Sequence, residues 1–230
     1  QANGHSRFAS ISPDGRYVAF ESEASNLVPG DRNGVKDVFV RDLQLGSTTR
    51  VSVSSSGNEG NGVSGRPSIS SGGQLVAFES VASNLVYSDT NGMQDVFVRN
   101  LATGETRRAS VSSAGVEGLG DSGEPAISAD GRWVAFSSWA ANLVPGDTRG
   151  FKDVFLHDLE TGQTTRVSLN SAGEESNGSS KNPALSADGR HIAFVSDATN
   201  LVMTDTNRCW DVFVHDRVTR QTTRVNTSST

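Results

Sequence analysis

The stretch that decides the fold is ISPDGRYVAF, which runs from Ile11 to Phe20. It returns as ISSGGQLVAF from Ile69, as ISADGRWVAF from Ile127 and as LSADGRHIAF from Leu185. The starting positions differ by 69 − 11, 127 − 69 and 185 − 127, which is 58 residues each time. A second motif keeps the same step and reads DVFV at Asp37, Asp95 and Asp211 and DVFL at Asp153. A fixed period of this size predicts an array of equivalent supersecondary units.

Each unit predicts four short strands joined by turns. In the second copy the expected strands are residues 66–70, 74–80, 95–101 and 106–111. These segments are rich in β-branched and aromatic residues and are bounded by Gly, Asp and Ser, as strands are. No window shows a sustained helical period, so we expect no long helix. The first turn carries Asp14-Gly15, Asp130-Gly131 or Asp188-Gly189, where Asp bonds the backbone and Gly supplies a positive φ.

A single four-stranded sheet leaves two apolar faces uncovered, and sheets that stand around an axis cover one another. The predicted fold is therefore all-β: a four-bladed β-propeller of four 58-residue repeats, each a four-stranded antiparallel blade. We expect one domain over residues 1–230, with repeats at about 1–58, 59–116, 117–174 and 175–230. The expected core includes Ile11, Phe20, Phe39 and Val51 and their equivalents Ile69, Phe78, Phe97 and Ala109.

The pattern ISPDGRYVAFES, DVFVRDL, TTRVSV resembles the β-propeller repeat of TolB-like proteins, and the resemblance covers all four units. That family's signature is Pro-x-Trp-Ser-Pro-Asp-Gly. The Trp position is occupied here by Ser10, Ser68, Ala126 and Ala184. The repeat also exceeds the usual blade of about 40–45 residues, and its surplus lies in two loops. The resemblance implies a propeller fold and leaves the function open, because such repeats serve scaffolds, binding proteins and gating domains of peptidases.

The two ends of the chain fall at nearly matching points of the repeat, since Gln1 is position 1 and Thr230 is position 56. We therefore expect a four-bladed ring that closes within one chain, as a monomer. Two other arrangements stay open: two chains that complete one eight-bladed ring, and four units of a longer array. Rings could also stack on one another, since identical patches invite head-to-tail contacts.

The segment GDRNGVKD, from Gly30 to Asp37, raises the question of a metal site. Calcium takes several oxygen ligands from a sharply turning backbone, and the segment resembles the calcium loops of integrin-type propellers. The candidate ligands are Asp31, Asn33, Asp37, Asp89, Asn91 and Asp95, and in the less complete copies Asp147, Asp153, Asp205, Asn207 and Asp211. Arg149 replaces the Asn in the third copy, and Arg208 replaces the Gly in the fourth.

The same residues are also turn formers, and this interpretation is favoured. Asp and Asn cap turns with their own side chains, and Asp37 can bond backbone amides where the strand begins. The nearby Asn-Leu-Val motif repeats at Asn26, Asn84, Asn142 and Asn200. We expect these asparagines to bond loop backbone, and a contact to sugar hydroxyls is the alternative.

No catalytic group is predicted. The histidines His5, His157, His191 and His215 lack the spacing of a metal centre, and no serine lies in Gly-x-Ser-x-Gly. Cys209 occupies the position of the apolar residues Val35, Met93 and Phe151, which predicts a buried thiol. Apart from calcium, we expect no cofactor.

The composition narrows the partners. The formal net charge of −6 argues against nucleic acid, whose binders usually carry a basic stripe. No apolar run approaches the roughly 20 residues of a membrane span. With no signal peptide in the numbered chain, we predict a mature extracellular or periplasmic protein. It is expected to be a non-enzymatic scaffold that binds a protein or a glycan. The alternatives are a self-assembling structural subunit and a hydrolase or lyase with a site at the axial mouth.

Overall fold

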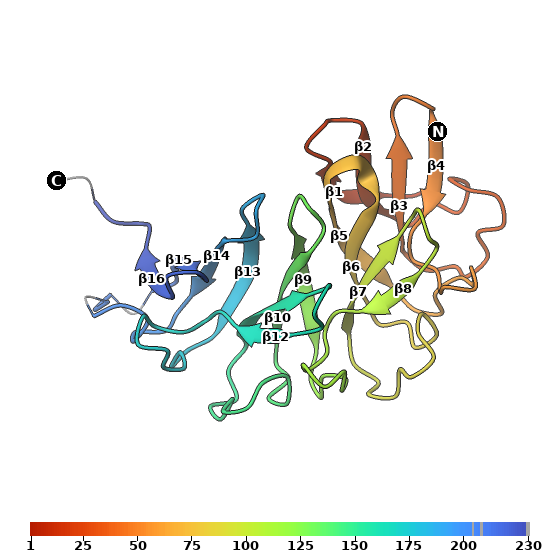
Figure 1. Ribbon diagram of the computed structural model, residues 1–230. Helices are drawn as coiled ribbons and strands as arrows, with labels where there is room; N and C mark the ends of the chain where they lie inside the picture. Colours follow the sequence, from red (N-terminus) through yellow and green to blue (C-terminus); the bar gives the residue numbers. More distant parts are fainter. Residues whose placement is uncertain (204, 208, 229–230) are drawn as a thin grey trace.

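The computed structural model describes residues 1–203, 205–207 and 209–228, and within them the chain forms four antiparallel sheets of four strands (Figure 1). Each sheet comes from one repeat, and its strands pair in the order in which they follow one another. The predicted all-β fold of four four-stranded blades is confirmed. Arg208, which breaks the fourth loop motif, lies outside the described residues.

The strands of the first two sheets are β1 (Ser6–Ile11), β2 (Tyr17–Ser22), β3 (Asp37–Asp42), β4 (Ser47–Arg50), β5 (Ser64–Ile69), β6 (Leu75–Ser80), β7 (Asp95–Asn100) and β8 (Thr106–Arg108). Those of the last two are β9 (Ser122–Ile127), β10 (Trp133–Ser138), β11 (Asp153–Asp158), β12 (Thr164–Arg166), β13 (Ser180–Leu185), β14 (His191–Ser196), β15 (Asp211–Asp216) and β16 (Gln221–Arg224). The helical content of the described residues is one 3-10 turn, Ser71–Gly73, and none of it is long and apolar enough to cross a membrane.

The local structure follows the turn chemistry of the repeat. Gly15 has a φ of 73°, and the Asp14 carboxylate accepts the backbone N–H of Arg16 at 3.1 Å. In the middle of each sheet two phenylalanines face each other across the second and third strands, as Phe20 and Phe39 do in the first sheet. The ring centroids of the four pairs lie 5.8–5.9 Å apart.

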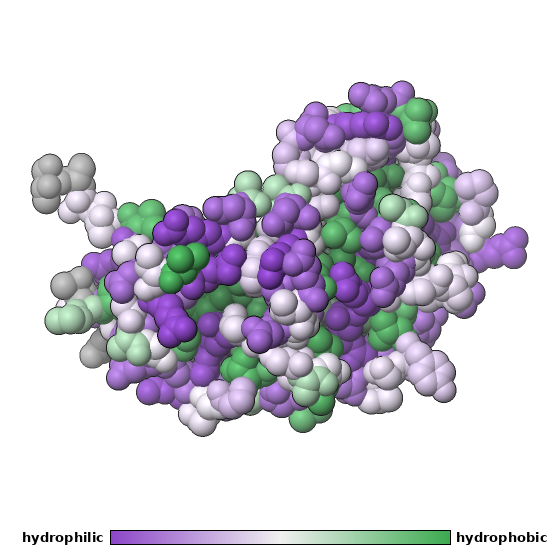
Figure 2. Space-filling view, in the orientation of Figure 1, coloured by the Kyte–Doolittle hydropathy of each residue, from purple (hydrophilic) through white to green (hydrophobic). Residues whose placement is uncertain are grey.

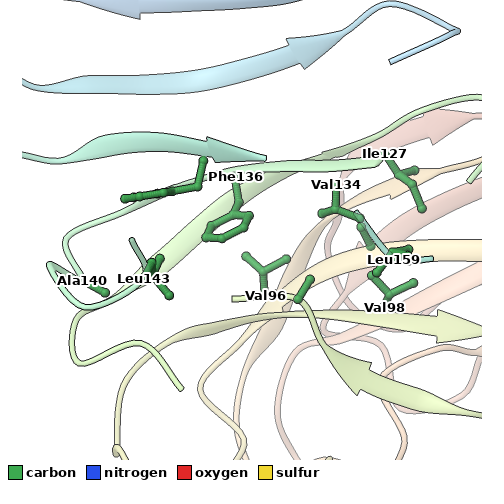
Figure 3. Close-up of a cluster of buried hydrophobic side chains, with 11 residues drawn as sticks. Val96, Val98, Ile127, Val134, Phe136, Ala140, Leu143 and Leu159 are labelled. Atoms are coloured by element: carbon green, nitrogen blue, oxygen red, sulfur yellow. The ribbon is translucent and has the colours of Figure 1, made fainter. Parts of the chain in front are cut away.

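The core lies between neighbouring sheets. Small and β-branched residues of one sheet, such as Val96 and Val98, pack against Phe136, Leu143 and other apolar side chains of the next (Figure 3). The same arrangement recurs between the first and second sheets and between the third and fourth. Full burial of one such side chain stabilises the fold by about 1.5–3 kcal/mol, so the two sheets of a joint stabilise each other.

Hydrogen bonds join the same neighbours. Thr106 donates its backbone N–H to Ser55 Oγ and its hydroxyl to the Val53 carbonyl, both in the preceding repeat. Thr164 and Thr222 repeat these two bonds one and two units on. These bonds fasten the outer strands β8, β12 and β16 to a loop of the preceding repeat.

The predicted closure of the ring within one chain is wrong. The four sheets form an open arc, with the first and last sheets at opposite ends (Figure 1) and a notch between them (Figure 2). The expected core residue Ile11 is 59% exposed on the first sheet, although its equivalent Ile69 is 6% exposed, and Phe20 is only partly buried. A closed ring requires the last sheet to cover the outer face of the first, and the exposed Ile11 shows that these two sheets do not pack together.

Candidate functional site

The innermost strands of the four sheets, β1, β5, β9 and β13, lie side by side, and each carries a β-bulge (Figure 1). At each bulge one residue other than glycine adopts the left-handed backbone conformation. These residues are Phe8, Arg66, Glu124 and Asn182, with φ values of 48°, 47°, 56° and 52°. Such a conformation costs about 1–3 kcal/mol and is found preferentially at functional sites.

The four bulges line one hollow of about 230 Å³ at the centre of the arc. Its walls are these four residues and the ones that follow them, Ala9, Pro67, Pro125 and Pro183. The backbone geometry repeats, but the side chains are an aromatic ring, a cation, an anion and an amide. Sequence reasoning missed this site. The available signal was four different residue types at one repeat position, three of them followed by Pro in a frame that otherwise repeats closely.

Carboxylates of neighbouring sheets hold the bulges in place. The backbone N–H of Arg66 donates to Glu21 Oε2 at 3.0 Å, and that of Glu124 donates to Glu79 Oε2 at 2.8 Å. The N–H of Asn182 donates to Glu124 Oε2 at 2.9 Å. Because three of the four bulges are fixed from the preceding sheet, the hollow is pre-organised by the packing of the arc.

Charges of both signs surround the hollow. Lys36 Nζ lies 2.8 Å from Glu21 Oε1, Lys152 Nζ lies 3.4 Å from Glu124 Oε2, and Arg66 Nε lies 3.5 Å from Glu79 Oε1. Lys181, the remaining lysine of the chain, adjoins the Asn182 bulge, and its ammonium lies 4.1 Å from the centroid of the Trp210 ring. All three lysines of the protein thus belong to this region.

Glu124, which lines the hollow, and Glu79, which accepts the backbone N–H of Glu124, have pKa values displaced in opposite directions. Burial raises the pKa of Glu79. Burial also raises the pKa of Glu124, but the hydrogen bonds from Asn182 and Ser137 and the charge of Lys152 outweigh it and lower the pKa overall. Neighbouring carboxyls with divergent environments can serve as acid and base in a reaction, and they can equally bind polar ligands.

The aspartates predicted as calcium ligands do converge, and a buried arginine lies among them. In the first repeat Arg50 lies 3.4 Å from Asp31 and 3.8 Å from Asp37, and it also pairs with Glu59. Sequence reasoning found the aspartates and missed the arginine and the glutamate. Their signal was the same 58-residue step, which places Arg108, Arg166 and Arg224, and then Glu117 and Glu175, in the same pattern.

The other repeats build the same arginine cluster. Arg108 contacts Asp89, Asp95 and Glu117, and Arg166 contacts Asp147, Asp153 and Glu175. In the fourth repeat Arg224 lies 3.5 Å from Asp205 and 3.6 Å from Asp211. In all four, the guanidinium supplies positive charge to two aspartates whose side chains are buried.

The asparagines of the candidate calcium loops act in turns. Asn33 Nδ2 donates to Asp37 Oδ2 at 2.8 Å, and Asn33 Oδ1 accepts the backbone N–H of Val35. Asn91 and Asn207 repeat both contacts in their loops. Asp37 accepts the hydroxyl of Ser52, which in turn accepts the N–H of Val38. These bonds stabilise the turn that begins the third strand.

The third arginine cluster has the geometry closest to a metal site. One oxygen from each of Asp147, Asp153 and Glu175 lies within 4.8 Å of the others. Burial, followed by the charge of Asp153, raises the pKa of Asp147 to about 6. Asp147 Oδ1 is buried and accepts no hydrogen bond. Within the described residues this is the one such acidic group, and Arg166 Nη1 lies 3.0–3.6 Å from its three carboxylates.

The Asn-Leu-Val asparagines bond loop backbone, as expected. Asn84 Nδ2 donates to the carbonyl of Glu59, and Asn84 Oδ1 accepts the N–H of Asn61. Asn26, Asn142 and Asn200 make the same pair of bonds in their repeats. Glu59 therefore joins two sheets, because its side chain pairs with Arg50 of the first sheet and its carbonyl is held by the loop of the second.

Two of the histidines bond threonines of their own sheets. His157 and His215 are buried, and their Nδ1 atoms bond the hydroxyls of Thr164 and Thr222. Burial lowers the pKa of His157 to about 4 and that of His215 in the same direction. The prediction of a buried thiol at Cys209 is wrong, because that side chain is exposed on the loop before β15.

A larger cleft of about 520 Å³ lies between the third and fourth sheets. Trp133, Leu156 and His215 form part of its wall, and Arg217 and Arg220 add positive charge. Arg217 stacks over the Trp133 ring at 3.9 Å. This cleft draws on the third and fourth repeats, whereas the axial hollow draws on all four.

Comparisons with solved structures confirm the fold. TolB from Acinetobacter baumannii matches with a TM-score of 0.59 and 19% identity over 99% of this chain and 45% of that one. A TolB homologue from Agrobacterium tumefaciens, described as the structure of putative TolB, gives 0.58 and 16% over 94% and 63%. An oligogalacturonate lyase in complex with manganese gives 0.57 and 14% over 96% and 53%.

These likenesses show a shared β-propeller fold, as the resemblance to TolB-like repeats implies. The chain spans about half to two thirds of the length of these three structures. No protein-family model matches the chain, and no curated protein matches it by sequence.

The backbone strain of the bulges can be measured at Arg66. Glycine removes the penalty of the left-handed conformation and alanine keeps it, so Arg66→Gly should exceed Arg66→Ala in free energy of unfolding by about 1 kcal/mol. At Arg107, in the regular strand β8, the order should reverse by roughly 0.5–1 kcal/mol. Urea unfolding of the four variants checks both differences. Equal stability of the two Arg66 variants would show that the bulge is not strained.

The raised pKa of Asp147 makes stability depend on pH. Because the folded state holds this proton up to about pH 6 and the unfolded state releases it near 3.8, stability falls as pH rises between those values. Asp147→Asn removes this loss. The free energy of unfolding of the variant minus that of the wild type should grow from pH 4 to pH 6 and level off above that. A difference that stays constant across this range would contradict the burial of a carboxyl there.

Proposed function

We propose that this chain is a non-enzymatic binding module whose axial hollow takes a polar group of a protein or a glycan. One observation carries the proposal: four strained bulges present four different functional groups to one space. If the bulges served only the fold, one residue type, glycine above all, would suit all four positions. Rigid scaffolds commonly present binding groups on irregular segments in this manner.

The size and chemistry of the hollow define what it can take. About 230 Å³ is below the range of roughly 300–1,000 Å³ that holds a whole small ligand, so the hollow suits one residue or one sugar unit of a larger partner. The Arg66 guanidinium lies 4.8 Å from the centroid of the Phe8 ring, which pairs a cation with an aromatic face. Glu124 and Asn182 add an anionic acceptor and an amide. Such a set favours a ligand rich in hydroxyl or amide groups.

The same proposal places the protein outside the cytoplasm, in the periplasm or beyond the cell. Glycans and surface proteins are available there.

A second candidate function is an acid–base reaction at the same hollow. The opposite pKa displacements of Glu79 and Glu124 favour it, and one propeller of similar fold is a lyase. Product formation separates the two functions. An enzyme should convert the glycan that it binds and lose turnover in Glu79→Gln, whereas a binding module returns the glycan unchanged.

Calcium at the loops stays a prediction, and the third arginine cluster is where it fits best. A calcium ion there would take oxygens from Asp147, Asp153 and Glu175. Arg166 already provides positive charge to those three groups, so the ion and the guanidinium compete for the same carboxylates.

Binding is tested on glycan and peptide arrays. The wild-type chain should be retained by one class of polar ligand. Arg66→Ala should weaken retention by roughly tenfold or more, because a hydrogen bond to a charged group contributes about 1.5–3 kcal/mol. Arg32→Ala, on an exposed loop, is the matched control, and Arg217→Ala tests the cleft instead. Loss of binding in Arg217→Ala with full retention in Arg66→Ala would move the site to the cleft.

Competition at the third cluster is tested by thermal unfolding with and without calcium. Arg166→Gln removes the guanidinium and leaves three carboxylates, so calcium should raise its melting temperature more than that of the wild type. Adding Asp147→Asn to Arg166→Gln should abolish most of this gain. If calcium stabilises the wild type as strongly as Arg166→Gln, the ion and the arginine do not compete.

A further inference from the structure

The open arc ends in two uncovered sheet faces. On the last sheet, Val212 is 37% exposed and Val225 is 53% exposed, although their equivalents Val38 and Val51 are fully buried against the second sheet. On the first sheet, Ile11 and Leu43 are exposed, although the equivalent of Ile11 in the second sheet is buried. Each end face therefore lacks the neighbour that the same residues have elsewhere in the chain.

The two end faces are the two halves of the joint that the chain already makes three times. Inside the arc, one side of each joint uses the positions of Ala19, Val38, Val40 and Val51, and the other uses those of Ile69, Val76, Phe78 and Phe97. The last sheet presents the first set as Ala193, Val212, Val214 and Val225. The first sheet presents the second set as Ile11, Val18 and Phe20, while Phe39, at the position of Phe97, is already buried behind Phe20. Each free face thus carries, at the equivalent positions, residues of the same type as one half of an internal joint.

The backbone bonds of the joint are also available at the ends. Across the three internal joints, Ser64, Ser122 and Ser180 donate their N–H groups to the carbonyls of Lys36, Gln94 and Lys152, at 2.6–2.9 Å. The equivalent pair at the ends is the N–H of Ser6 and the carbonyl of Trp210. Thr48 stands likewise at the position of Thr106, and Thr227 at that of Val53, whose carbonyl accepts the threonine hydroxyl. An end-to-end joint would reproduce these bonds.

We propose that two copies of this chain associate head to tail and close one eight-bladed ring. The last sheet of each copy covers the first sheet of the other, so both joints are made from the surfaces just described. A head-to-tail interface of this kind forms a ring when its rotation closes. Propellers typically have about four to eight blades. Two copies of this four-bladed arc give eight blades, whereas three copies would exceed that range.

One internal contact is missing at this seam. Glu21 and Glu79 hold the bulges of the next sheet, and the last sheet has Val195 at their position. No linker crosses the seam within the two-copy ring either. The association should therefore be weaker than an internal joint and reversible on dilution, and it does not depend on what the axial hollow binds.

Light scattering coupled to size-exclusion chromatography tests the ring over a range of concentrations. The wild-type chain should approach twice the 24.2 kDa of one chain as the concentration rises and return toward one chain on dilution. Ile11→Glu and Val225→Glu each put a charge into the seam on a side chain that is more than half exposed in one copy, so each should fold and stay at the mass of one chain. Circular dichroism confirms folding of both.

The control is Val116→Glu. Val116 is 54% exposed on a loop away from both ends, and repeat three has Glu174 at the same position. This variant should associate like the wild type. A mixture of Ile11→Glu and Val225→Glu should regain the mass of two chains, since one of the two seams then joins two unaltered faces.

Three results would overturn the proposal. The first is a wild-type chain that stays at the mass of one copy at every concentration, as expected if further blades of another kind cover the ends. The second is a mass that grows beyond two copies, which indicates an open filament. The third is a mixture of the two variants that stays monomeric.

Discussion

The structure depends on one requirement: every sheet has two apolar faces, and each face must be covered by another sheet. Val96 and Val98 cannot be shielded by their own sheet, because the β-pleat points them at the next one, where Phe136 meets them. The stabilisation is therefore a property of joints. Repeating the sequence every 58 residues repeats the joint, and so the polar contacts that accompany it are repeated as well.

This requirement also positions the candidate site. The inner strands are brought together only because the faces behind them pack. At three of the four bulges the carboxylate that holds the backbone belongs to the preceding sheet, as Glu79 does for Glu124. Function and packing thus share the same joints but different positions. Where the repeat must pack, the residues stay alike, and at the bulges they become Phe8, Arg66, Glu124 and Asn182, since nothing in the core constrains those side chains.

The sequence predicts most of the fold and little of the site, for a physical reason. Strands and turns follow from local patterns, and the second repeat has its strands within two or three residues of the expected bounds. Closure of the ring is set by the angle between sheets, which no single repeat encodes, and Ile11 was misplaced for that reason. The bulge at Arg66 depends on a carboxylate 45 residues earlier, and the cluster around Arg50 joins groups from three segments. Spacing alone shows neither.

The arginine clusters show why a repeat of this kind can hold its loops without an ion. Three carboxylates at such short distances from one another repel unless a positive charge lies between them. A metal ion or a guanidinium can provide that charge. The guanidinium is tethered to the fourth strand, so its contribution does not depend on the supply of metal, and its planar donors reach several carboxylates at once. In the first three repeats the pairing also crosses a joint, since Glu59, Glu117 and Glu175 each lie on the segment that leads to the next sheet. An arginine buried in one sheet thereby helps to fix the position of the next sheet. The bulges of the axial hollow lie on those sheets, so their positions are fixed by the same contacts.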